Sequence, residues 1–150
     1  MGDPMDLVEI ETMIFSRFST ASRHSGDPVL DRSAYLLLSR IDATRPMSIN
    51  ELSVALGLNP STVTRQAAAA VRGGILQRIP DSAGGLARKY ELTDEGRQRL
   101  AAQRRAHRGF LAEVLRDWSS DDVTAFAAYL RRFNSDVENR QGFAWPRQAP

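Results

Sequence analysis

The sequence predicts a mostly helical α+β chain that carries one small β-hairpin. Three observations lead to this fold class. Apolar residues recur at helical spacing in several segments, polar stretches with glycine or proline separate those segments, and two short neighbouring segments alternate as strands do. The length of 150 residues suits one domain with a hydrophobic core, so we expect a single domain over residues 1–150.

Two helices are predicted in the first third of the chain. Residues 5–22 carry one apolar stripe at spacings of three and four, made of Leu7, Ile10, Ile14 and Phe18. The sequence Ser-Gly-Asp-Pro at 25–28 interrupts helical geometry. A second helix follows at 30–43 and ends ahead of Pro46, because the residue before a proline is displaced from the helical region.

A short helix is predicted over residues 49–56, with both of its ends specified. Ser48 and Glu51 have the spacing of a capping box, in which each side chain accepts a hydrogen bond from the other residue's backbone N–H. Gly57 suits the left-handed position that follows a helix. The helix therefore stops abruptly, as it must if a tight turn follows.

The next predicted helix covers residues 60–72. Asn59 is a favourable N-cap, and Pro60 occupies the first helical position, where its missing N–H costs nothing. One side of the helix is apolar, with Val63, Ala67 and Ala70 followed by Gly74, and the other carries Ser61, Thr64, Arg65, Ala68 and Arg72. Taken alone, this second face fits a DNA major groove and the solvated side of a helix bundle equally well.

A hairpin is predicted after that helix. Residues 75–80 and 86–92 read as short strands, because Tyr90 and Leu92 alternate with charged neighbours. The loop between them, 81–85, contains the residues that favour turns.

Two helices and an irregular tail complete the predicted chain. Thr93 caps a long helix, whose inner stripe consists of Leu100, His107, Leu111, Val114 and Trp118. Ser119 and Asp122 resemble another capping box and begin the last helix, which carries the apolar residues Val123, Phe126, Leu130, Phe133 and Val137. The tail from Gln141 onward is expected to be irregular. Four aromatic side chains of this region are expected to form part of a dimer core rather than a ligand-binding cage: Trp118, Phe126, Tyr129 and Phe133.

Composition excludes several kinds of site. The chain has no cysteine, which excludes thiol redox chemistry, a cysteine nucleophile, an iron–sulfur cluster and a Cys-type zinc site. Its only histidines are His24, expected at an exposed helix end, and His107, expected to pack at a helix interface. We expect no metal, no cofactor and no catalytic residues.

The sequence also bears on location. No apolar run approaches the roughly 18 residues that span a bilayer. The N-terminal segment is acidic, unlike a secretory signal. We therefore expect a cytoplasmic protein without membrane contact.

Charge is distributed unevenly along the chain. Residues 48–108 hold ten basic and five acidic residues, whereas residues 1–47 and 109–150 are slightly acidic. A basic centre is typical of a module that binds phosphate groups, although scatter in an arginine-rich composition gives the same pattern.

The predicted order places a short helix, a tight turn and a second helix directly ahead of a hairpin. This is the layout of a winged helix-turn-helix, in which the second helix enters the DNA major groove and the hairpin is the wing. In these segments the sequence resembles the MarR family of bacterial regulators. The resemblance rests on SINELSVALGL at 48–58, PSTVTRQAAAAVRGGILQRI at 60–79 and YELTDEG at 90–96.

The resemblance implies a bacterial transcriptional regulator, expected to be a repressor, that binds a palindromic operator in double-stranded DNA as a homodimer. It implies a winged lobe at 30–96 and dimerisation helices at 5–22 and 97–139. It further implies that a small, often phenolic, ligand binds between lobe and scaffold and releases the DNA. The residues expected to contact DNA are Ser48, Asn59, Ser61, Thr62, Thr64, Arg65, Arg72, Arg88 and Lys89.

The wing departs from the family pattern at its tip. The family pattern has an Asp-Arg or Asp-x-Arg pair there, whose arginine enters the minor groove, but residues 84–86 read Gly-Gly-Leu. We expect Arg88 or Lys89 to contact backbone phosphate instead. The alternative is that Arg88, on the same strand face as Tyr90, turns inward to pair with an acid.

Two other function classes remain open from the residues alone. A winged-helix domain can bind proteins instead of DNA, but the basic centre and Arg65 argue against this alternative. A small enzyme is the other class, and no glycine-rich phosphate loop, metal cluster or nucleophile–base pair supports it.

Overall fold

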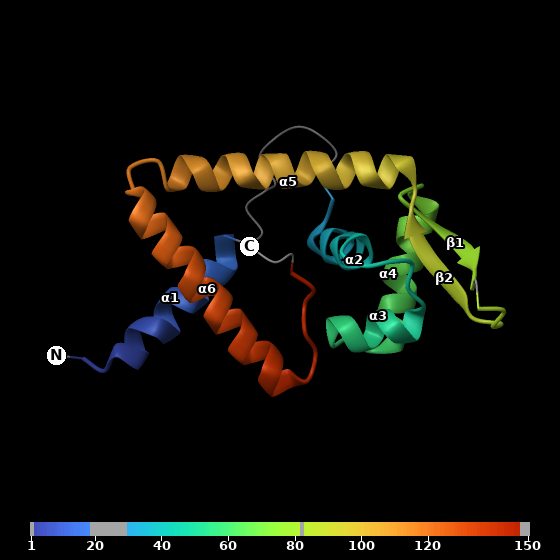
Figure 1. The fold of residues 1–150 in the computed structure, drawn as a ribbon, viewed down its shortest axis with the longest axis horizontal. Helices are drawn as coiled ribbons and strands as arrows, with labels where there is room; N and C mark the ends of the chain where they lie inside the picture. Colours follow the sequence, from blue (N-terminus) through green and yellow to red (C-terminus); the bar gives the residue numbers. More distant parts are fainter. Residues whose placement is uncertain (1, 19–29, 82, 148–150) are drawn as a thin grey trace.

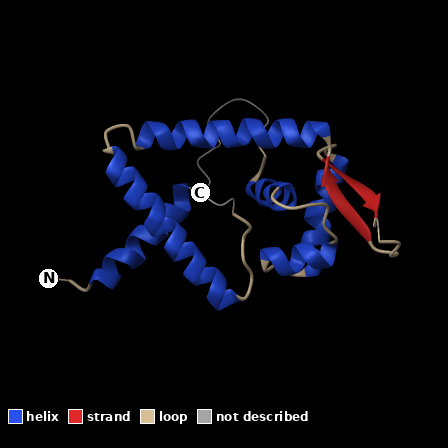
Figure 2. Ribbon diagram, in the orientation of Figure 1, coloured by secondary structure: helices blue, strands red, loops and turns tan. Residues whose placement is uncertain are grey.

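The structure is a computed structural model that describes residues 2–18, 30–81 and 83–147. Within these residues the chain forms six helices and one two-stranded antiparallel sheet (Figure 2). The elements are α1 (Pro4–Phe18), α2 (Arg32–Asp42), α3 (Ile49–Leu56), α4 (Pro60–Arg72), β1 (Leu76–Pro80), β2 (Arg88–Leu92), α5 (Asp94–Val114) and α6 (Ser120–Gln141). The predicted fold class and the predicted order of elements are confirmed.

Several predicted boundaries differ from the observed ones. The long helix α5 ends at Val114, so Trp118 lies in the turn before α6 and not on the helix. The second strand begins at Arg88, because Gly84 and Gly85 keep the preceding residues in the loop. Helix α2 begins two residues later than predicted, because Asp31 is its N-cap and accepts a hydrogen bond from the N–H of Ala34 at 2.8 Å. The predicted end of the first helix, residues 19–22, and His24 lie outside the described residues.

The elements form a lobe and a scaffold joined by α5 (Figure 1). Helix α5 runs along one side of the whole molecule. At one end it lies beside α2 and the hairpin, with α3 on the far side of the lobe, and at the other end α6 turns back and crosses α1. A groove lined by residues of both helices confirms that α1 and α6 lie side by side.

The buried core belongs to the lobe. Its hydrophobic residues all lie between Leu30 and Leu100, and the largest of them that are fully enclosed are Leu37, Leu38, Leu52, Val63, Leu76 and Leu100. Helices α1 and α6 contain no buried residue within this single chain. The scaffold, formed by α1 and α6, therefore exposes large apolar side chains that no other part of the described chain covers.

Strand β2 is held between β1 and the segment before α3. Leu76 pairs with Leu92 and Pro80 with Arg88 at the two ends of the hairpin. On the other side, Met47 and Tyr90 exchange two backbone hydrogen bonds of 3.1 and 2.8 Å. This bridge brings the start of α3 beside the wing.

Candidate DNA interface

The turn between α3 and α4 is fixed by its own residues. Gly57 follows α3 with φ of 63°, the left-handed region that favours glycine. Asn59 then caps α4: its side-chain oxygen accepts hydrogen bonds from the backbone N–H and the hydroxyl of Ser61, each at 3.1 Å. The predicted turn chemistry is confirmed, and it sets the direction in which α4 leaves the lobe.

Helix α4 presents two different faces, as predicted. Val63, Ala67 and Ala70 are buried in the lobe. Ser61, Thr64, Arg65 and Arg72 are exposed, and Thr62 is half-buried between the two faces. Within the residues that the structure describes, Arg65 and Arg72 make no hydrogen bond or ion pair with the rest of the protein, so their guanidinium groups are available to a partner.

The hydroxyl groups on this face are partly engaged. Thr64 donates a hydrogen bond to the carbonyl of Pro60 at 2.8 Å, and Ser61 donates to Asn59. In this arrangement both hydroxyls offer acceptor lone pairs outward rather than protons. They therefore fit donor groups on base edges better than phosphate oxygens unless the hydroxyls rotate.

The predicted capping box at the start of α3 is confirmed. The Ser48 hydroxyl accepts from the Glu51 N–H at 3.2 Å, and a Glu51 carboxylate oxygen accepts from the Ser48 N–H at 2.9 Å. The half-buried Ser48 is thus first a structural residue, although its hydroxyl proton has no partner within the described chain.

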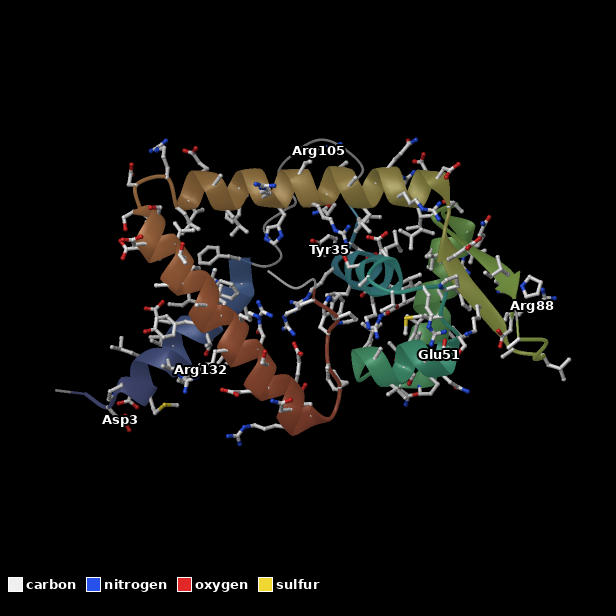
Figure 3. The ribbon with its side chains drawn as sticks, in the orientation of Figure 1. Asp3, Tyr35, Glu51, Arg88, Arg105 and Arg132 are labelled. Carbon is white, nitrogen blue, oxygen red and sulfur yellow. The ribbon has the colours of Figure 1, made fainter. Side chains whose placement is uncertain are left out.

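The two basic residues of β2 differ from each other. Arg88 is exposed, and among the described residues it has no hydrogen-bond or ion-pair partner, so the alternative of an inward-facing Arg88 is wrong. The Lys89 side chain is only 17% exposed, and its ammonium nitrogen lies 3.5 Å from a Glu51 oxygen and 3.9 Å from an Asp81 oxygen. Lys89 is therefore engaged inside the protein, and of the two residues Arg88 is the one that faces outward (Figure 3).

Sequence reasoning missed Glu51 as a partner of the wing. Its capping role was evident from its spacing to Ser48, but Lys89 lies far along the chain and only the Met47–Tyr90 bridge brings the two together. The pKa of Glu51 lies below its usual value, chiefly because its carboxylate accepts the Ser48 N–H, with further contributions from the positive charges of Lys89 and Arg45.

The wing tip lacks a charged residue among those described. Gly84 has φ of 79°, and Leu86 is fully exposed. This agrees with the departure seen in the sequence: the residues at the tip are small or apolar, and the nearest outward-facing cation is Arg88 at the start of β2.

His107 packs as expected from its place on α5. Its ring lies edge-on to that of Tyr35, with the ring centres 6.5 Å apart. Among the described residues no group of three or more His, Asp or Glu side chains is arranged to hold a metal ion. None of the described helices is both long and apolar enough to cross a membrane.

A cavity of about 480 Å³ lies beside the exposed face of α4. Thr62 and Arg65 contribute to its wall, and Arg99 at the start of α5 adds a second guanidinium group. The apolar residues that line it are Leu30, Ala34, Ala69, Ala70 and Ile75. Asp31, Ser33 and Gln66 also line it, so the wall is part apolar and part polar, with one carboxylate and two guanidinium groups.

Known proteins are similar to this chain in sequence and in fold. No protein-family model matches the chain. An uncharacterized HTH-type transcriptional regulator of Bacillus subtilis (strain 168), YxaD, is 30% identical over 136 residues, which cover 88% of this chain and 94% of YxaD. A MarR family protein from Bacillus stearothermophilus has a similar structure, with a TM-score of 0.74, 19% identity and coverage of 91% of this chain and 99% of that one. FabT of Streptococcus pneumoniae, whose structure was solved in complex with DNA, matches with a TM-score of 0.74, 18% identity and the same coverage.

Proposed function

Since this chain belongs to the MarR family of helix-turn-helix transcriptional regulators, we propose that it binds a palindromic operator in double-stranded DNA as a homodimer and represses transcription there. The chain is a regulator and not an enzyme. The observation that carries the proposal is the exposed face of α4, where Arg65 and Arg72 stand beside small polar residues with no partner among the described residues.

The chemistry of this face suits a major groove. Small residues allow the helix backbone to approach the bases, and an arginine can donate two hydrogen bonds to guanine O6 and N7. The backbone N–H groups at the start of α4, together with the helix dipole, favour a phosphate. We assign base contacts to Ser61, Thr64, Arg65 and Arg72, and phosphate contacts to the α4 N-terminus with Asn59 and Thr62, to Ser48, and to Arg88.

The uncovered scaffold supports the homodimer. Helices α1 and α6 expose large apolar side chains, among them Leu7, Phe15, Tyr129 and Phe133. Exposed apolar faces of this extent are interaction surfaces, and a second copy of the chain covers them symmetrically. We therefore propose residues 30–96 as the DNA-binding lobe, and 5–22 and 97–139 as the dimerisation helices.

The cavity beside α4 supports release by a small ligand. Its size falls within the range usual for small-molecule sites. Because Arg65 lines this cavity and also lies on the proposed DNA face, an acidic aromatic molecule that binds there competes with DNA for the same guanidinium group. A phenol or aromatic carboxylate is the ligand class that we propose.

Replacing Arg65 tests the DNA-binding function. A duplex is first selected from a random-sequence pool with the wild-type protein. Arg65→Ala should then lose about 1–3 kcal/mol of binding free energy per half-site, because a bidentate base contact is gone. Fluorescence anisotropy with the selected duplex measures the loss, and urea unfolding checks that the variant is folded.

Arg105→Ala is the matched control. Arg105 is an exposed arginine on α5, away from α4, so its removal changes the net charge equally without touching the proposed interface (Figure 3). If Arg65→Ala binds the selected duplex as tightly as Arg105→Ala does, the assignment of the recognition face is wrong. If the wild-type protein retains no duplex even at low salt, a protein-binding winged helix replaces the proposed function.

A further inference from the structure

Glu51 is the meeting point of contacts from three segments. One carboxylate oxygen accepts the backbone N–H of Ser48, and the other lies 3.5 Å from both Lys89 on β2 and Arg45 in the loop before α3. Lys89 also approaches Asp81 at the end of β1. The negative charge of an acidic residue in a DNA-binding lobe repels the phosphate groups of DNA, so Glu51 is expected to have a role that outweighs this repulsion.

The contact between Glu51 and Lys89 joins two separate DNA-binding elements. Glu51 belongs to the first helix of the helix-turn-helix, and Lys89 belongs to the wing. Across residues 30–81 and 83–147, this is the only side-chain ion pair between the hairpin and helices α3 or α4. It adds to the backbone bridge between Met47 and Tyr90 and to the burial of Leu76, Tyr90 and Leu92 in the core.

Burial makes this contact more consequential than an ordinary surface ion pair. The side chain of Lys89 is 17% exposed and that of Glu51 is 35% exposed, so both charges have lost much of their water. A lysine that has lost part of its hydration is stabilised by nearby carboxylates, and removing Glu51 would leave Lys89 with only the more distant oxygen of Asp81, 3.9 Å away. Without Glu51, Lys89 loses its contact with α3, and the part of β2 before the buried Tyr90 is then joined to α3 by no side-chain ion pair within the described residues.

We propose that Glu51 is a positioning residue for DNA binding: through Lys89 it holds the wing at a fixed angle to α4. The wing and α4 can then contact the same DNA without the wing first having to become ordered. The inference rests on the proposed DNA-binding function. A preorganised pair of contacts binds more tightly than the same contacts joined loosely, because less conformational freedom is lost on binding.

The proposal and simple electrostatics predict opposite effects for Glu51→Gln. If Glu51 acted only through its charge, removing it would strengthen binding to DNA, because one repulsion with phosphate disappears and Lys89 is freed. If Glu51 positions the wing, the same substitution should weaken binding to the selected duplex by roughly tenfold. The glutamine oxygen can still accept the Ser48 N–H, so the capping box and the fold are retained.

Glu91→Gln provides a control with the same change in charge. Glu91 lies on the same strand and accepts a hydrogen bond from Gln77 of β1 at 2.7 Å, so it is held within the hairpin and not against α3. We expect this variant to bind the selected duplex as tightly as the wild type or more tightly. Lys89→Met is a second test variant, since it breaks the same contact from the wing side and leaves the capping box of α3 untouched.

A second measurement follows the wing without any DNA. The chain has no cysteine, so Ala83→Cys in the loop between the strands provides a single site for a fluorescent label. Time-resolved anisotropy of that label should show greater local motion in Glu51→Gln and in Lys89→Met, and no change in Glu91→Gln. Both substitutions remove the same contact between Glu51 and Lys89. The double variant Glu51→Gln/Lys89→Met should therefore bind DNA as tightly as whichever single variant has the lower affinity.

The outcomes separate this inference from the proposed function. Failure of the wild-type protein to bind any duplex defeats the proposed function, and with it a role of Glu51 in DNA binding, whatever the label shows. If the wild type binds but Glu51→Gln binds equally well or better, the positioning role is overturned. It is also overturned if binding weakens while the label shows no added motion of the wing.

Discussion

At Gly96 the backbone of α5 lies directly against that of Ile75, where the hairpin begins. A side chain at this position would place its first carbon 2.1 Å from the carbonyl oxygen of Ile75, which no relaxation of a side chain can relieve. The contact is supported by Thr93, whose N–H donates to the same carbonyl at 3.2 Å and whose hydroxyl donates to that of Gly74. The absence of a side chain at Gly96 thus sets how closely α5 approaches the hairpin.

Gly96→Ala is therefore expected to destabilise the lobe. The free energy of unfolding should fall by about 3 kcal/mol, the upper end of the range for forcing an extra carbon into a packed site. Urea unfolding monitored by circular dichroism measures this loss. Gly73→Ala is the control, because its φ of −75° is helical and an added carbon meets nothing closer than 3.4 Å. An equal loss of stability in both variants would show that the contact with Ile75 is not the cause.

Individual residues also show where sequence reasoning succeeds and where it stops. The partners of Ser48 and Asn59 lie two or three positions away, so their spacing alone predicts the caps. The partner of Lys89 lies 38 positions away, and nothing in the local pattern of β2 indicates it. The alternation of strand residues predicted which face Arg88 shares with Tyr90, but β2 begins at Arg88, and its side chain extends beyond the packed part of the sheet.

At the scale of elements, the wing of this protein differs from the pattern of its family. Its tip carries Gly84, Gly85 and the fully exposed Leu86, so it has no tip arginine to enter the minor groove. Arg88 is the outward-facing cation closest to the tip. The wing is therefore better suited to the phosphate backbone than to a base edge.

Arg88→Ala should weaken binding to specific and random DNA alike. The slope of log affinity against log salt should fall by about one unit per half-site, because each lost phosphate contact releases one counterion fewer. A salt titration of duplex binding measures both effects. Lys89→Ala, by contrast, should lower the stability of the lobe and leave the slope nearly unchanged. An unchanged slope in Arg88→Ala would mean that this arginine makes no contact with phosphate.

The tail after α6 connects the scaffold to the lobe. The ring of Phe143 lies over Gly57, so close that a first side-chain carbon at that glycine would be 2.7 Å from it. Glu138 anchors the tail by accepting hydrogen bonds from the Trp145 N–H at 3.1 Å and from the guanidinium group of Arg147. The sequence predicted an irregular tail, and residues 143–147 are irregular, but only the folded chain brings them to the helix-turn-helix.

The attachment of the tail should depend on pH. The pKa of Glu138 lies below its usual value, first because Arg147 donates a hydrogen bond to it and also because the Trp145 N–H does. Its charged form therefore stabilises the attached tail above the usual carboxyl pKa of about 4.3, and this stabilisation is lost as the pH falls through the lowered value. Fluorescence of Trp145 in a Trp118→Phe background should report release of the tail under acidic conditions. The same titration in Glu138→Gln should show no such transition.

For the whole molecule, the exposed apolar side chains of α1 and α6 predict a dimer. Tyr129 is 70% exposed and Phe133 is 50% exposed, and both line the groove between α6 and α1. Light scattering at micromolar concentration should therefore give twice the 16.7 kDa of a single chain. A mass of one chain would contradict the dimer.

Phe133→Glu should shift the protein toward a single chain, because it places a charge in the apolar surface that the partner covers. The same light-scattering measurement follows the shift. Leu86→Glu, on the exposed wing tip, is the control and should leave the mass unchanged. Dissociation by both substitutions would mean that the scaffold is not the interface.

The position of the core between Leu30 and Leu100 also bears on how the protein is made. A ribosome releases the chain from its N-terminus, and compact units fold as they emerge. The core residues of the lobe all precede α6 in the chain, so they leave the ribosome before α6 does. The scaffold instead requires α1 and α6, and α6 follows the lobe in the chain. We therefore expect the proposed DNA-binding lobe to fold before two chains can pair through these helices.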